Sequence, residues 1–335
     1  MTQNTFFEIA RQEFFSTSMK NITLSKKGKK KLPDAEDKEI AKEIIRIHTK
    51  LKKMLMADGE WKWINENKKP GYIRALQQGD PEALAAILAN VFQEDASYGF
   101  YTYDTDSLKA SMISDLNIWR EFTERDDISS LAMPDVGIAH GIIVDGTLIA
   151  PFQPRHDYYA LKVKSLGPKT VLEIGGGYGG LALQLSRRAK VRYINCDLPE
   201  TLYVAYYFLK KVGLHVRWAI DTWPDAPIVF VPTNRRRMIK KADLVFNGLS
   251  FSEMSKETVD DYFELINHIW KPRYIFHQNS NVLLFPDSPR HIEVLARDFP
   301  IDKKYREIYR AISPWQGGGG RYREYLYDRG TGIDF

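Results

Sequence analysis

The sequence has few of the features that mark secreted or membrane proteins. It contains a single cysteine, Cys196, so no disulfide can form within the chain. No apolar run reaches the length that spans a bilayer. The first residues carry Glu8, Arg11 and Glu13 among apolar positions, which is unlike a signal peptide. These absences predict a cytoplasmic protein without a membrane span.

The chain also has no strong excess of charge of either sign. Its 48 basic and 43 acidic residues give a net charge of +5. No RNA-binding module is recognisable, so we expect no nucleic-acid partner. Two basic clusters, at 26–31 and 235–241, are predicted to be solvated surface rather than phosphate sites, and acidic residues follow the first at once.

The composition indicates a well-packed globular protein, with 44% hydrophobic and 13% aromatic residues. Residues 1–150 are predicted to form a mainly helical accessory region. It has an aromatic helix near the N-terminus, helical stripes at 36–56 and from Pro81, and a hairpin turning at Asp145-Gly146. Residues 151–335 should form the core. We expect the accessory region to cover an acceptor or to mediate self-association into a homo-oligomer, and the core to be complete without it.

A cluster of five glycines follows a short apolar run ending in Ile174. This predicts a strand–loop–helix junction, where an α/β sheet holds a nucleotide-like cofactor. Gly175-x-Gly177-x-x-Gly180 fits the dinucleotide fingerprint. Read as Glu173-x-Gly175-x-Gly177-x-Gly179, the same residues resemble the first motif of class I S-adenosylmethionine-dependent methyltransferases, in which the acid positions the ammonium group of the methionine moiety.

The sequence downstream favours the methyltransferase. The predicted strand 191–197 ends in Asp197, which can accept the ribose hydroxyls of either cofactor. The segment 242–247 resembles the fourth methyltransferase strand, with Asn247 at its end. Segments 305–312 and 322–329 alternate as a terminal antiparallel hairpin, which the dinucleotide fold generally lacks. We therefore predict an α/β doubly wound sheet of the class I methyltransferase type, closed by that hairpin.

Several motifs make the resemblance closer. They are Glu173-Ile174-Gly175-Gly176-Gly177-Tyr178-Gly179-Gly180, Asp197-Leu198-Pro199-Glu200-Thr201, Ser250-Phe251-Ser252-Glu253-Met254-Ser255 after Asn247, and Tyr322-Arg323-Glu324-Tyr325. Together they resemble the sugar O-methyltransferase family over about residues 60 to 330. The resemblance implies O-methylation of a sugar hydroxyl in a glycan, nucleotide sugar or glycosylated metabolite, as in polysaccharide biosynthesis. A small-molecule natural-product O-methyltransferase is the alternative.

The resemblance also implies S-adenosylmethionine as the cofactor. The residues expected to bind it are Arg155, Tyr159, Glu173, Gly175, Gly176, Gly177, Asp197, Leu198 and Asn247. Arg155 is the candidate to hold the cofactor carboxylate, although a surface ion pair would explain it equally well.

Two residues are candidates for the general base that a sugar hydroxyl needs. Glu253 follows the fourth strand, although a carboxylate there could simply be a helix-start residue. His277 is expected at the end of the fifth strand, where a packing histidine is the alternative. His156 and His140 rank behind them. No compact trio of carboxylates requires a metal, so we predict a metal-independent reaction.

Overall fold

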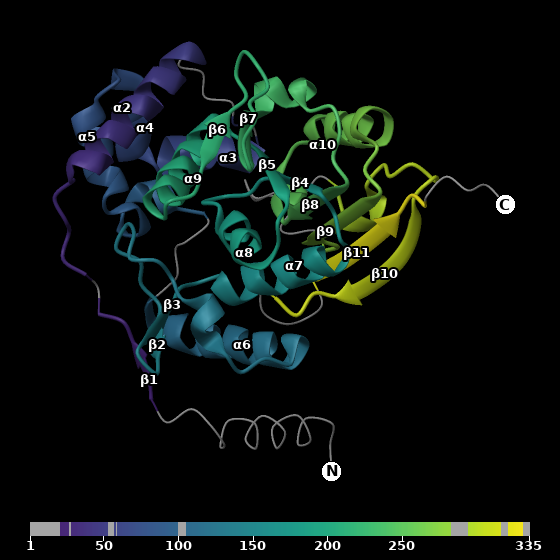
Figure 1. The fold of residues 1–335 in the computed structure, drawn as a ribbon, viewed down its shortest axis with the longest axis horizontal. Helices are drawn as coiled ribbons and strands as arrows, with labels where there is room; N and C mark the ends of the chain where they lie inside the picture. Colours follow the sequence, from purple (N-terminus) through teal and green to yellow (C-terminus); the bar gives the residue numbers. More distant parts are fainter. Residues whose placement is uncertain are drawn as a thin grey trace.

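The computed structural model describes residues 21–26, 28–52, 57, 59–99, 105–282, 294–315 and 321–330 (Figure 1). The predicted aromatic helix with Phe6, Phe7, Phe14 and Phe15, and the glycine run 317–320, lie outside the described residues. No helix in the described ranges is both long and apolar enough to cross a membrane.

An eight-stranded sheet forms the centre, in the order β10-β11-β9-β8-β4-β5-β7-β6. All neighbours from β9 to β6 are parallel, whereas β11 pairs antiparallel with both β9 and β10. The strands are β4 Thr170–Ile174, β5 Arg192–Asp197, β6 Val216–Trp218, β7 Ile228–Pro232, β8 Leu244–Gly248, β9 Tyr274–Ser280, β10 Arg306–Ile312 and β11 Tyr322–Asp328. The predicted doubly wound α/β fold with a terminal antiparallel hairpin is confirmed.

The central strands β4, β5, β7 and β8 are buried on both faces, whereas the edge strand β10 is largely exposed. Successive side chains of a strand point to opposite sides of the sheet. In β4, Val171 joins one apolar cluster and Leu172 the other. The first cluster lies under helices α7 Gln153–Ser165, α8 Gly180–Arg188 and α9 Pro199–Lys211, and the second under α10 Lys256–Glu264. Two-sided burial explains why these strands read as nearly continuous apolar runs.

A small second sheet joins the start of the described chain to the middle of the sequence. Strand β1 Ile22–Leu24 pairs antiparallel with β2 Ile142–Val144, which pairs with β3 Thr147–Ile149. The predicted hairpin turn is confirmed, with Gly146 at φ +81°. The N-terminal strand is thereby fixed beside residues that immediately precede α7.

The accessory region contains more helices than the sequence predicted. The two predicted helices are confirmed as α2 Ala35–Lys50 and α5 Pro81–Leu88, although α2 ends earlier than expected. Helices α3 Gly59–Asn67, α4 Pro70–Gln78 and α6 Thr105–Thr123 were not predicted. Shorter helical segments occur in both regions. Those of the accessory region are η1 Val91–Gln93, η2 Asp95–Ser97 and η3 Ile128–Leu131. Those of the core are η4 Thr233–Met238, η5 Ser250–Glu253, the π-helical η6 Leu265–Trp270, and η7 Ala296–Asp298.

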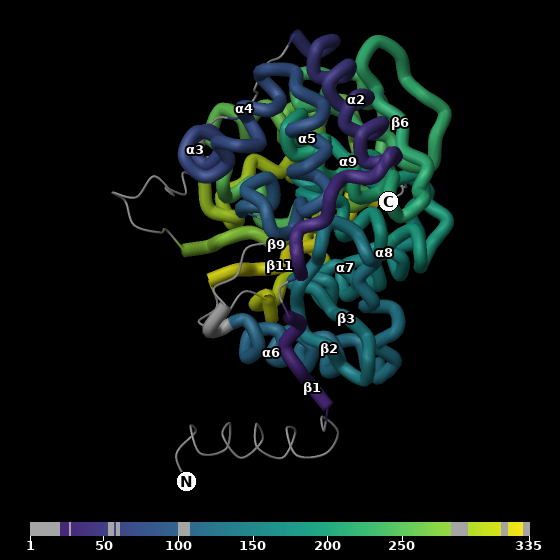
Figure 2. Tube along the Cα trace, turned by 90° about the vertical axis from the view of Figure 1, so that its left-hand side faces the viewer, coloured from purple at the N-terminus to yellow at the C-terminus, as the bar shows by residue number. Residues whose placement is uncertain are grey.

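Helix α2 packs directly on α9, so the described part of residues 1–150 and the predicted core share one apolar cluster (Figures 1 and 2). Polar contacts reinforce this packing. The Tyr207 hydroxyl donates to Asp37 Oδ1 at 2.8 Å, and His48 Nδ1 lies 3.2 Å from the Tyr203 hydroxyl. A fragment starting at about residue 151 would expose this face of α9. We therefore no longer expect such a fragment to fold and bind the cofactor by itself.

This shared core predicts a large effect for a substitution far from the cavity. Ile44 on α2 is completely buried in the common cluster. Ile44→Ala should lower the free energy of unfolding by about 2–5 kcal/mol, through lost burial and a residual cavity. Chemical denaturation would measure the loss. Arg46→Ala, at an exposed position of the same helix, is the control; an equal loss in both variants would contradict the shared core.

Candidate active site

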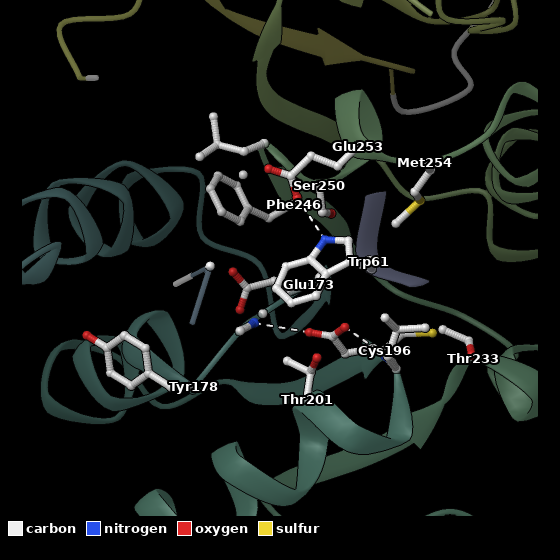
Figure 3. Close-up of a pocket in the computed structure, with 18 of the residues that line it drawn as sticks. Trp61, Glu173, Tyr178, Cys196, Thr201, Thr233, Phe246, Ser250, Glu253 and Met254 are labelled. Atoms are coloured by element: carbon white, nitrogen blue, oxygen red, sulfur yellow. Dashed lines mark hydrogen bonds between the residues drawn. The ribbon is translucent and has the colours of Figure 1, made fainter. Parts of the chain in front are cut away.

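A cavity of about 370 Å³ opens at the carboxyl ends of β4, β5 and β8 (Figure 3). Eight of the predicted cofactor residues line it, namely Arg155, Tyr159, Glu173, Gly175, Gly176, Gly177, Asp197 and Leu198. Parallel strands place such residues together because their carboxyl ends meet at one edge of the sheet. Glu253 also lines this cavity, whereas Asn247 and His277 do not.

The glycine loop closes tightly between β4 and α8. Gly175 and Gly177 have φ angles of +75° and +55°, in the left-handed region that favours glycine. A Cβ on Gly175 would lie only 2.1 Å from Ser250 Oγ, so the β8 side of the cavity leaves no room for a side chain. The loop therefore keeps its backbone against the cavity wall.

Glu173 is a buried carboxylic acid in the cavity wall, with 5% of its surface exposed. The Tyr193 hydroxyl from β5 donates to its Oε2. Burial raises the pKa of Glu173 to about 8, and the negative charge of Asp197 adds to that effect while Arg155 opposes it. The group can thus accept a cationic ligand group or hold a proton near neutral pH.

Asp197 lies beside Glu173 at the end of β5. Its Oδ2 accepts a hydrogen bond from the Gly177 backbone N–H at 3.0 Å and its Oδ1 accepts from Leu198 N–H at 2.7 Å. Burial raises its pKa to about 7, although these two hydrogen bonds act in the opposite direction. Glu200 raises the pKa further, and Lys69 lowers it. The carboxylate is therefore held rigidly between the loop and α9.

Arg155 brings a positive charge to the same cavity. Its guanidinium lies over the Phe152 ring at 4.4 Å, and Nη1 is buried without a hydrogen-bond partner in the described part of the chain. The neighbouring His156 also lines the cavity, and burial together with Arg155 lowers its pKa well below the usual range. An anionic ligand group would satisfy the buried guanidinium donor.

Tyr159 contributes its ring to the cavity and not a free hydroxyl. That hydroxyl donates to Glu324 Oε1 at 3.0 Å, a buried carboxylate that also accepts from Lys162 Nζ at 2.8 Å. The ring packs on Phe246 with centroids 5.1 Å apart. Tyr159 is consequently part of the apolar wall.

Asn247 lies one layer behind the cavity wall. Its Nδ2 donates to the Ile174 carbonyl at 3.0 Å and to Ser250 Oγ at 2.6 Å, while its Oδ1 accepts from Asn279 Nδ2 at 2.9 Å. These bonds join the ends of β4, β8 and β9. The amide thus shapes the turn that carries Ser250, which does line the cavity.

The two candidate bases lie in different environments. Glu253, at the end of η5, accepts a 2.9 Å hydrogen bond from Trp61 Nε1 at the cavity (Figure 3). His277 is fully buried inside β9, which extends three residues beyond the predicted end, and its ring stacks on Tyr325. Burial lowers the pKa of His277 to about 3. His140 does not line the cavity either.

Several lining residues were not predicted from the sequence. Trp61 comes from α3, more than a hundred positions before the glycine loop. Thr201 and Thr233 line the cavity, and each has a buried Oγ1 without a hydrogen-bond partner in the described ranges. Arg236, from the second basic cluster, also reaches the cavity, with its Nε donating to Asp261 at 2.7 Å. Thr201 lies inside the Asp-Leu-Pro-Glu-Thr motif, and Arg236 lies in the basic cluster that was predicted to be solvated surface but is partly buried at the cavity.

Groups of three or more histidine, cysteine or acidic residues that could hold a metal ion are absent from the described residues. The buried carboxylates Glu173 and Asp197 are instead accompanied by single cations such as Arg155.

Comparisons with known proteins reach no further than fold resemblance. No family model matches the chain, and no curated protein matches it. Among solved structures, the chain is similar to the methyltransferase domain of bacterial CtHen1-C at 15% identity, covering 53% of this chain and 97% of that one, with a TM-score of 0.38. It is also similar to the small RNA methyltransferase HEN1 at 14% identity, covering 58% of this chain and 30% of that one, with a TM-score of 0.39.

A third similar structure is phosphoethanolamine N-methyltransferase 2 of Haemonchus contortus, solved with phosphomonomethylethanolamine and S-adenosylhomocysteine. It is 20% identical, covers 41% of this chain and 33% of that one, and has a TM-score of 0.30. Because these likenesses are weak, we base the function on the cavity itself.

The close approach at Gly175 predicts a specific loss of stability. Gly175→Ala should lower the free energy of unfolding by about 1–3 kcal/mol more than Gly146→Ala, because its Cβ must displace Ser250. Gly146 is a matched control, since its φ is also positive but nothing lies within 4 Å of its Cβ position. Denaturant titration of both variants would measure the difference; equal losses would show that the loop can shift without cost.

Proposed function

We propose that the protein is an S-adenosylmethionine-dependent O-methyltransferase that methylates a sugar hydroxyl in a glycan, nucleotide sugar or glycosylated metabolite. One observation carries the proposal. The glycine loop, two acids at adjacent strand ends and Arg155, whose buried Nη1 has no hydrogen-bond partner among the described residues, line the same cavity. A small-molecule O-methyltransferase is the alternative, which the apolar wall around Phe246 would also suit.

The polar groups of the cavity fit the charges of this cofactor. Asp197 is suited to accept the two ribose hydroxyls, Glu173 to hold the ammonium group, and Arg155 to hold the carboxylate. The buried hydroxyls of Thr201 and Thr233 need partners that polar atoms of a nucleoside could provide. A dinucleotide would use Asp197 in the same way, but it has no ammonium group to match Glu173.

The chain's own residues would orient the reactants and move one proton. When bound, S-adenosylmethionine supplies an electrophilic methyl group. The rings of Tyr159 and Phe246 exclude water from one side of the cavity. Glu253 Oε2 is held by Trp61, and its carboxylate would take the proton from the acceptor hydroxyl. Aromatic faces such as that of Trp61 suit a sugar ring, which supports a sugar acceptor.

Ligand binding tests the cofactor assignment directly. S-adenosylhomocysteine should raise the melting temperature, because it binds the folded state alone, and the stabilisation is about 2.7 kcal/mol at one hundred times Kd. Asp197→Ala should bind it more weakly by about 1–3 kcal/mol, because the ribose loses a charged acceptor. NAD should leave the melting temperature unchanged; stabilisation by NAD without any by S-adenosylhomocysteine would contradict the proposal.

The role of Glu253 is tested by removing its ability to take a proton. Glu253→Gln keeps the shape of the side chain, so kcat for methyl transfer to nucleotide sugars should fall by about 10²–10⁴-fold. The affinity for S-adenosylhomocysteine, measured by calorimetry, should stay the same. Glu257→Gln, at an exposed position of the next helix, is the control. Wild-type turnover in Glu253→Gln would exclude this residue as the base.

A further inference from the structure

The start of α9, beside the cavity, is held by side chains from the accessory helices. Asn65 Nδ2 from α3 donates to Glu200 Oε1 at 2.7 Å, and the Tyr72 hydroxyl from α4 donates to the Glu200 carbonyl at 2.6 Å. All three residues are buried. Figure 2 shows α3, α4 and α9 in the upper part of the view. Glu200 lies three residues after Asp197, which lines the cavity. The contacts to Glu200 therefore hold a segment next to the wall of the proposed cofactor site.

In the sequence, Lys69 lies between Asn65 and Tyr72, the two residues that donate hydrogen bonds to Glu200. It is the residue preceding α4 and is only 1% exposed, with its ammonium 4.9 Å from the centre of the Trp61 ring. Three carboxylates act on it electrostatically, those of Glu200, Asp197 and Asp95. The accessory region thus places a buried positive charge beside the acids that end β5 and start α9.

The buried carboxylates of Asp197 and Glu200 lie close together, and a nearby positive charge such as the Lys69 ammonium stabilises their ionised forms. Asp197 and Glu200 are 8% and 0% exposed, and the negative charge of Glu200 raises the pKa of Asp197. Among the described residues of the cavity, the other groups near Asp197 do not supply this charge, and Arg155 acts on Glu173. Glu173 is acidic, Cys196 and Tyr262 ionise only as anions, and the Arg236 guanidinium already pairs with Asp261.

We propose that Lys69 is a positioning residue for cofactor binding, which keeps Asp197 ionised for the ribose hydroxyls and makes the accessory helices part of the donor site. This inference rests on the proposed function. It explains why a lysine is buried at a junction where α3 and α4 otherwise contribute an amide, a hydroxyl and an indole.

The inference has a specific pH signature. The pKa of Asp197 is about 7 with Lys69 present, and burial lowers the pKa of Lys69 itself to about 8. Removing the ammonium raises the pKa of Asp197, so the acid is protonated at higher pH. A rise of about one unit would reduce its ionised fraction at pH 7 about fivefold. Above pH 8 the difference should close, because Lys69 is then neutral in the wild type as well.

Calorimetric titration with S-adenosylhomocysteine between pH 6 and pH 9 tests the expected pH dependence of the Lys69 effect. Lys69→Met should bind about fivefold more weakly than the wild type at pH 7 and about equally at pH 9. Lys69→Arg, which keeps the charge, should restore the wild-type profile. Lys68→Met is the matched control, because Lys68 is exposed and lies over Trp63 on the outer side; it should have no effect.

Other outcomes would overturn the inference. An equal loss of affinity at every pH would show that Lys69 has only a structural role, and unchanged affinity would show that it has none in binding. Lys69→Gln is the second neutral variant, should Lys69→Met fail to fold. If the wild-type protein itself does not bind S-adenosylhomocysteine, the proposed function fails, and that result is obtained before any variant is compared.

Discussion

The site depends on one constraint, the burial of acidic side chains at the carboxyl ends of β4 and β5 and at the start of α9. Glu173, Asp197 and Glu200 each have less than a tenth of their surface exposed. Ionised carboxylates are costly to remove from water unless hydrogen bonds or cations replace the lost hydration. The backbone N–H groups of Gly177 and Leu198, a tyrosine hydroxyl from β5, and charges from α7 and the accessory region provide that replacement.

This constraint links two regions that the sequence suggested were separate. Helix α9 carries Glu200 at its start, and its apolar side is covered by α2. Tyr72 of α4 belongs to the same apolar cluster and donates to the Glu200 carbonyl, so the helices that share the core also hold the start of α9 beside the cavity. An accessory region arranged in this way is part of the fold and not an addition to it.

Burial also distinguishes the two candidate bases, His277 and Glu253. His277 lies within a strand that has hydrogen-bonded neighbours on both sides, so its side chain is enclosed among aromatic rings. Glu253 lies just beyond a strand end, where a short helical turn brings it to the cavity. A difference of a few residues in strand length decides which of the two can meet a ligand, because pairing with β11 extends β9 beyond the apolar run.

The sequence by itself determined the features that consecutive residues encode. These include the glycine loop, the acid ending β5 and the hairpin turn at Gly146. Each depends on local backbone conformation or on the period of apolar residues, which can be read within a short window. The order of motifs was sufficient to predict the doubly wound sheet and its terminal hairpin.

Only the tertiary structure decided which distant residues complete the cavity. Trp61 reaches Glu253 across 192 positions, and Asn65 reaches Glu200 across 135. Lys69 reads in the sequence as one more surface lysine. Such contacts leave no local pattern, because they depend on how helices pack, and packing is set by the whole apolar core rather than by any one segment.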